Sequence, residues 1–137
     1  MPMKVTETAA AGAVHPSPFI GPINHQVGIL VDVSTLTTDE VDNYGYLKPG
    51  VILTQTGDLV SLTTEVAYGA VIEAVKVAPA GSDSTALAAI TTDVEVAVGL
   101  WVLLNRDILE DSLGRAVSAN ELLAINAAGS HVALTNT

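Results

Sequence analysis

Three histidines are the side chains in this sequence best suited to binding a metal or moving a proton at neutral pH. They are His15, His25 and His131. No two of them have the short spacing that zinc ligands usually show, and the chain has no cysteine to complete a site. We therefore expect no histidine metal site and no bound cofactor.

Three carboxylates, Asp107, Glu110 and Asp111, have a spacing that places them on one face if their segment is helical. Such a face could hold a divalent ion or meet a basic partner. Carboxylate metal sites in helix bundles also use histidines from facing helices. The alternative is a solvated face near the positive end of a helix, between Arg106 and Arg115. The sequence leaves both interpretations open.

The sequence patterns of common active sites are missing from this chain. It has no Gly-x-Ser-x-Gly motif, no phosphate-binding Walker loop and no Gly-x-Gly-x-x-Gly motif. Without cysteine it has no thiolate nucleophile, and no serine or threonine stands near a histidine with an orienting acid. We predict that the protein is not an enzyme.

The charge of the chain argues against nucleic acid as a partner. Fifteen acidic residues face five basic ones, which gives a formal net charge of −10. A surface of this sign repels phosphate backbones, which bind proteins through Lys and Arg. The longest apolar run, residues 96–104, is far shorter than the ~20 residues that span a bilayer. We therefore expect no nucleic-acid partner, no membrane partner and synthesis in the cytoplasm.

The positions of β-branched residues and turns predict a mainly β domain of the α+β class with one or two short helices. Ser118 and Glu121 have the spacing of a capping box, which predicts a helix over residues 119–127. Alternating strands and long helices are missing, so a doubly wound sheet is excluded. The predicted strands cover residues 27–33, 51–53, 69–77, 94–104 and 131–134.

Residues 1–26 have the composition of an extended N-terminal arm, followed by a single β-rich domain over residues 27–137. Three prolines between His15 and Pro22 favour extended backbone. One interpretation is a disordered terminus. The other is an arm that docks on a partner through a contact segment that contains the only phenylalanine of the chain. The residues assigned to that segment are Pro16, Pro18, Phe19 and Ile20.

Trp101, the only tryptophan, lies within the strongest predicted strand, over residues 94–104. Tryptophan is common at the centres of protein interfaces, but a single tryptophan also commonly fills a core. We keep both interpretations. For the first, we assign Trp101 and Leu100 to a contact between protomers.

Several segments of the chain resemble the head decoration proteins of tailed phages, the lambda-like capsid-stabilising group. Residues 47–53 with 56–60 are similar to that family's turn, strand and hairpin. Residues 68–75 resemble its next strand, and residues 94–109 its late strand and the turn that follows. The lambda protein itself is shorter and differs at its end, and the pair formed by residues 119–127 and 131–134 fits only some relatives.

The resemblance implies a compact β-tulip-like domain that acts on the outside of a virion. Members of that family assemble as homotrimers at the three-fold and quasi-three-fold positions of the expanded shell. There they bind the major capsid protein, partly through the N-terminal arm, and hold the shell against the pressure of the packaged DNA. The alternative is another virion structural or adhesion module, such as a tail or fibre component or a carbohydrate-binding domain.

Overall fold

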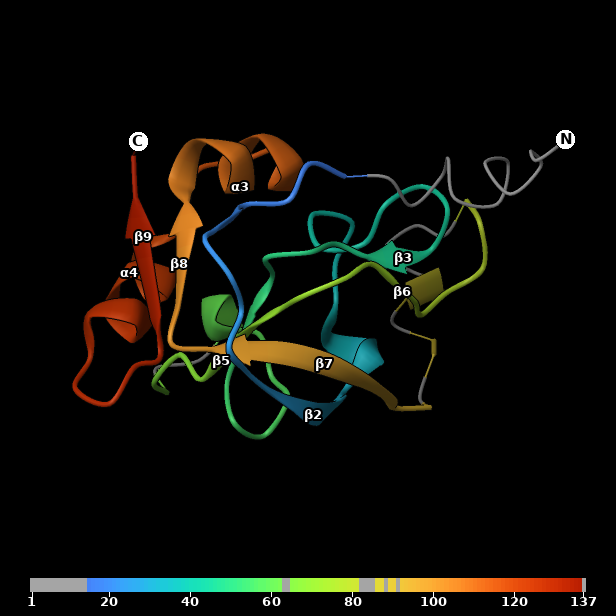
Figure 1. Cartoon of the computed structure of the whole chain (residues 1–137). Coiled ribbons are helices and arrows are strands. Elements are labelled where there is room, and N and C mark those ends of the chain that lie inside the picture. The colour runs from blue at the N-terminus through green and yellow to red at the C-terminus, as the bar shows by residue number, and fades with distance from the viewer. Residues whose placement is uncertain (1–14, 63–64, 82–85, 88, 91, 137) are drawn as a thin grey trace, which may run out of the picture.

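The computed structural model describes residues 15–62, 65–81, 86–87, 89–90 and 92–136 (Figure 1). Strand outweighs helix, at 31% against 21%, which confirms the predicted mainly β, α+β class. The buried side chains are almost all Val, Leu, Ile and Ala, as expected for a chain with so few aromatic residues. The hydrophobic effect of these aliphatic side chains is what holds the sheets together.

An antiparallel sheet with the strand order β2-β7-β5-β4 forms the centre of the molecule. Its strands are β2 (His25–Val31), β7 (Val94–Leu100), β5 (Gly69–Val71) and β4 (Ile52–Leu53). Side chains alternate between the two faces of a strand. Val96, Val98 and Leu100 of β7 therefore enter the core, while Glu95 and Ala97 face outward.

A second sheet has the order β1-β8-β9, with β8 antiparallel to β1 and parallel to β9 (Figure 1). Its strands are β1 (Phe19–Ile20), β8 (Val102–Asn105) and β9 (Val132–Thr135). A third, two-stranded sheet pairs β3 (Tyr46–Leu47) with β6 (Val75–Lys76). Two short 3-10 helices, η1 (Val33–Thr35) and η2 (Val60–Leu62), complete the connections.

Two of the predicted strands are broken, and the prediction of one continuous strand was wrong in both cases. The run over residues 94–104 is interrupted at Trp101, whose φ is 53°. β7 and β8 consequently belong to different sheets. The run over residues 69–77 divides in the same way into β5 and β6. In each case periodicity predicted the apolar character of the run correctly but gave no sign of the change of sheet.

The helices α3 (Arg106–Leu113) and α4 (Ala119–Asn126) connect β8 to β9. Asn105 caps α3 by accepting a hydrogen bond from the amide of Ile108 at 3.1 Å. At the start of α4, the capping box predicted from Ser118 and Glu121 is confirmed. The Ser118 hydroxyl accepts from the Glu121 amide at 3.2 Å, and the Glu121 carboxylate accepts from the Ser118 amide at 2.9 Å.

The structure places residues 15–26, the last part of the predicted arm, within the body of the molecule. His15 is hydrogen-bonded to Asp42 at 2.8 Å, and the amide of Asn105 donates to the carbonyl of Pro18 at 2.7 Å. Phe19 and Ile20 form β1, and β2 begins at His25. The body therefore includes residues 15–26, because β1 pairs with β8 and β2, which begins at His25, pairs with β7. Residues 1–14 lie outside the described residues.

Hairpin 54–58, in which the amide of Thr54 donates to the carbonyl of Asp58, is predicted to be sensitive to substitution of its glycine. Gly57 has a φ of 88°, and a Cβ there would collide with the carbonyl oxygen of Leu30. Gly129 has the similar φ of 91° but open space around it. We expect Gly129→Ala to lower the free energy of unfolding by about 1 kcal/mol through backbone strain alone. Gly57→Ala should lower it by about 3 kcal/mol, because a collision adds to the strain.

Urea unfolding followed by the fluorescence of Trp101 measures both values. Equal losses in the two glycine variants would show that hairpin 54–58 is not packed against β2.

Candidate functional site

Trp101 is the most unusual residue in the described part of the chain. It is the only residue there other than glycine that has a positive φ. Its side chain is 64% exposed. A left-handed conformation costs an L-residue about 1–2 kcal/mol, and such strain often accompanies function. Trp101 therefore does not serve to fill the core. Its exposure at a strained backbone position indicates a role at the surface.

Histidine rings hold the indole from two sides. The ring of His25 lies 4.9 Å from that of Trp101 at an interplanar angle of 75°. The ring of His131 lies 4.6 Å away at 67°, and it contacts the ring of Tyr68 at 5.3 Å in turn. Edge-to-face contacts of this kind favour a fixed ring geometry. The indole is therefore both exposed and held in one orientation.

The outer face of the second sheet continues the apolar surface beside Trp101. Ile20 of β1 is paired with Leu103 of β8, and Leu103 is paired with Ala133 of β9. All three side chains are exposed, whereas Leu104, the next residue of β8, is fully buried. We call Ile20, Trp101, Leu103 and Ala133 together the Trp101 surface. Large apolar residues grouped in this way are typical of a contact surface for another molecule.

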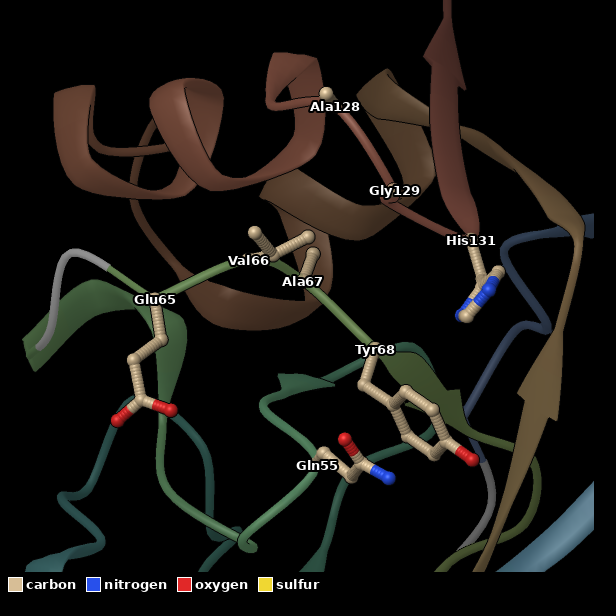
Figure 2. Close-up of a pocket in the computed structure, with 8 residues that line it drawn as sticks. All are labelled: Gln55, Glu65, Val66, Ala67, Tyr68, Ala128, Gly129 and His131. Carbon is tan, nitrogen blue, oxygen red and sulfur yellow. The ribbon is translucent and has the colours of Figure 1, made fainter.

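Two hollows lie on either side of His131. One, of about 300 Å³, is lined by Trp101, Leu103, Ser130, His131 and Ala133, among others. The other, of about 460 Å³, is shown in Figure 2. Its full lining is Gln55, Glu65, Val66, Ala67, Tyr68, Ala128, Gly129 and His131.

The larger hollow does not have the arrangement of a hydrolytic site. Nδ1 of His131 is buried and has no hydrogen-bond partner among the described residues. In Figure 2, the Glu65 carboxylate lies at the other end of the hollow from the His131 ring, and the lining includes no serine, threonine or cysteine. A nucleophile, a base and an orienting acid in hydrogen-bond reach are what acyl transfer requires. These lining residues do not supply that set.

Of the residues that sequence analysis assigned to contacts, the structure buries some and exposes others. Leu100 is only 7% exposed and belongs to the core, so it is not available to another protomer, whereas Trp101 is. Pro18 is also buried, next to Gly50, where an added Cβ would lie 2.5 Å from its ring. Pro16 and Ile20 are exposed, and Phe19 is half-buried against the core.

The acidic cluster of Asp107, Glu110 and Asp111 does lie on a helix, α3. Glu110, however, is engaged within the molecule, because it accepts hydrogen bonds from the amide of Val117 at 2.8 Å and from Arg106 at 3.1 Å. These bonds lower the pKa of the Glu110 carboxyl. In the described part of the chain, no group of three or more His, Asp or Glu side chains is arranged to hold a metal ion.

An ion network centred on Arg115 was not predicted from the sequence. Its guanidinium donates to Glu121 at 2.7 Å, to Asp39 at 3.2 Å and to Glu40 at 3.4 Å. Glu40 and Glu121 are only 3% and 5% exposed. The bonds to Glu121 are the main reason why the pKa of Arg115 is raised. The network fastens α4 to the turn over residues 37–40, so its role is structural.

Comparison of the chain with protein-family models, with curated proteins and with solved structures finds no match in any of the three. Within the described residues, no helix combines the length and the apolar character needed to cross a membrane.

Strain at Trp101 gives a testable difference between two variants. Trp101→Gly and Trp101→Ala both remove the ring contacts, but alanine keeps a Cβ at a φ that disfavours it. We expect the alanine variant to be less stable than the glycine variant by about 1 kcal/mol. Urea unfolding followed by circular dichroism measures this difference. An alanine variant as stable as the glycine variant would contradict a strained corner.

Loss of Arg115 should be costly, because it leaves two buried carboxylates unpaired. We expect Arg115→Met to lower the free energy of unfolding by about 2–3 kcal/mol. Arg106→Met is the matched control, since its i,i+4 pair with Glu110 is more exposed and should be worth only about 0.5 kcal/mol. Thermal unfolding of both variants tests this prediction, and equal losses would refute the structural role of the network.

Proposed function

We propose that this protein is a structural virion protein that binds the outer surface of an expanded phage capsid and stabilises it. In this proposal it acts as a homotrimer at three-fold and quasi-three-fold positions, and its partner is the major capsid protein. The observation that carries the proposal is the Trp101 surface. It is an exposed apolar face whose indole ring is already held in one orientation before any partner binds. Fixed aromatic side chains bind without much loss of conformational entropy, which is why they dominate many interfaces.

The charge of the molecule supports a place on the outside of the shell. The formal net charge is −10, so packaged DNA on the inside would repel it. On the outer surface the same charge keeps unbound copies apart and soluble. The resemblance of residues 47–60, 68–75 and 94–109 to head decoration proteins points to the same location.

Stabilisation in this proposal comes from many weak contacts made together. A trimer brings three copies of the Trp101 surface to neighbouring capsid subunits, and linked contacts bind far more tightly than single ones. His15 is held by Asp42, so the chain directly after residues 1–14 is anchored to the body. We assign those residues, with the exposed Pro16 and Ile20, to the capsid contact.

A second candidate function is adhesion to a carbohydrate, as part of a tail, fibre or other surface module. The specific observation in its favour is an exposed indole beside a hollow of about 300 Å³. Small-ligand sites combine an apolar surface of this kind with a few polar groups. A glycan array would show binding that depends on Trp101 if this function were correct, and none if the capsid function is correct.

Co-sedimentation with shells tests the capsid function. We expect the protein to bind expanded but not unexpanded shells of the major capsid protein from the same genome. Trp101→Ala should weaken this binding at least tenfold. Truncation of a tryptophan at the centre of an interface typically costs about 2 kcal/mol or more of binding free energy. The matched control is Leu123→Ala on α4, since Leu123 is 69% exposed but lies outside the Trp101 surface.

Truncation provides the second arm of the same experiment. Removal of residues 1–14 should weaken binding, while the pairing of β1 with β8 and of β2 with β7 is kept. Removal of residues 1–20 should also destabilise the fold, because β1 is lost from β8. Equal binding of the protein to both kinds of shell, or full binding of Trp101→Ala and of the shorter truncation, would overturn the proposal.

A further inference from the structure

β2 is the outermost strand of the central sheet (Figure 1), and part of its outer edge makes no backbone hydrogen bond to another described residue. The amide of Ile72 donates to the carbonyl of Ala97, so the backbone of Ala97 faces β5. Backbone groups of neighbouring residues point in opposite directions, so Val98 faces β2, where it is paired with Val27. It follows that the amides and carbonyls of Gln26 and Gly28 point away from the sheet.

These outward groups have no hydrogen-bond partner among the residues that the structure describes. Further along the edge, hairpin 54–58 covers the carbonyl of Leu30. Proteins usually protect such edges with a lysine, a proline or a bulge, and β2 contains neither lysine nor proline. The open section, from His25 to Ile29, is therefore suited to pairing with another strand.

Glu95 gives this edge a charge preference. Gly28 has no side chain, and the Glu95 carboxylate of the neighbouring β7 leans over it, so that a Cβ on Gly28 would lie 2.9 Å from Oε2. The carboxylate has no ion-pair or hydrogen-bond partner among the described residues. A cation on an added strand, opposite Gly28 and on the same face, would come within reach of it.

Every basic side chain in the described part of this chain is engaged within the molecule, and Lys4 lies outside the described residues. The internal partners are the Ser112 carbonyl for Lys48, the Tyr44 carbonyl for Lys76, Glu110 for Arg106, and Asp39, Glu40 and Glu121 for Arg115. A lysine or arginine of another protein would meet Glu95 without breaking any of these internal contacts. A second copy paired at Gly28 would instead bring two Glu95 carboxylates together, and like charges repel.

We infer that the β2 edge accepts an extended segment of a partner protein, which pairs with Gln26 and Gly28 and carries a lysine or arginine opposite Gly28. The main-chain hydrogen bonds give the affinity, and Glu95 selects the basic residue. Exposed Leu30 on the same face favours an apolar residue two positions away. The inference stands on the geometry of β2 and does not depend on the proposed function.

A pair of synthetic peptides tests this site with the intact protein. The probe is a capped heptapeptide with a central lysine between alternating threonines and valines, and its control carries glutamate at the centre. We expect the lysine peptide to bind at least tenfold more tightly, with slower hydrogen exchange of the Gln26 and Gly28 amides. Trp101 fluorescence is a second readout, since the indole contacts His25 at the start of β2.

Two variants test separately the Glu95 charge and the backbone hydrogen bonding of the β2 edge. Glu95→Gln should remove the difference between the peptides, and it introduces no backbone change. Gln26→Pro should weaken both peptides at least tenfold, because it removes an outward amide from an edge strand, where proline is tolerated, and leaves Gly28 and Glu95 unchanged.

The inference is overturned if neither peptide binds at millimolar concentration, or if the two bind equally. It is also overturned if exchange slows elsewhere than at Gln26 and Gly28. A dimer seen by analytical ultracentrifugation and lost in Gln26→Pro would assign the edge to a second copy of this chain instead.

Discussion

The left-handed backbone at Trp101 is the constraint on which the arrangement of the sheets depends. A single apolar run has to supply the central strand of one sheet and of the next, and these sheets do not share a direction. The change happens at one residue, with a φ of 53°. Ring contacts with His25 and His131 hold that residue in place, and they also join the start of β2 to the start of β9. The same corner that forms the fold therefore presents the indole to solvent.

The polar contacts of the molecule have a different role. They hold the loops and helix ends in place around the aliphatic core. Arg115 joins α4 to the turn at Glu40, and His15 joins the entering chain to Asp42. Buried carboxylates such as Glu40 are costly unless they are paired. Pairing inside the body leaves few cations on the surface, so the outside of the molecule is acidic and any charged partner should be basic.

The sequence was most informative where one local interaction determines the structure. The box formed by Ser118 and Glu121 gave the start of α4, because both partners lie within one helical turn. The break at Trp101 could not be predicted, because tryptophan rarely adopts a positive φ and the rings that support it come from distant segments. The network around Arg115 could not be predicted either, because two of its partners, Asp39 and Glu40, come from a distant segment of the chain. Leu100, assigned to a contact, belongs to the core because it lies on the same face of β7 as the buried Val96 and Val98.

The pairing within the second sheet has a consequence for how the protein is made. Ile20, Leu103 and Ala133 lie side by side, although 83 residues separate the first from the second and 30 the second from the third. A nascent chain, or one released prematurely, lacks β9 and cannot display the complete apolar face. Contacts between such distant parts of a chain also form slowly. The complete apolar face therefore exists only once β9 has joined β8.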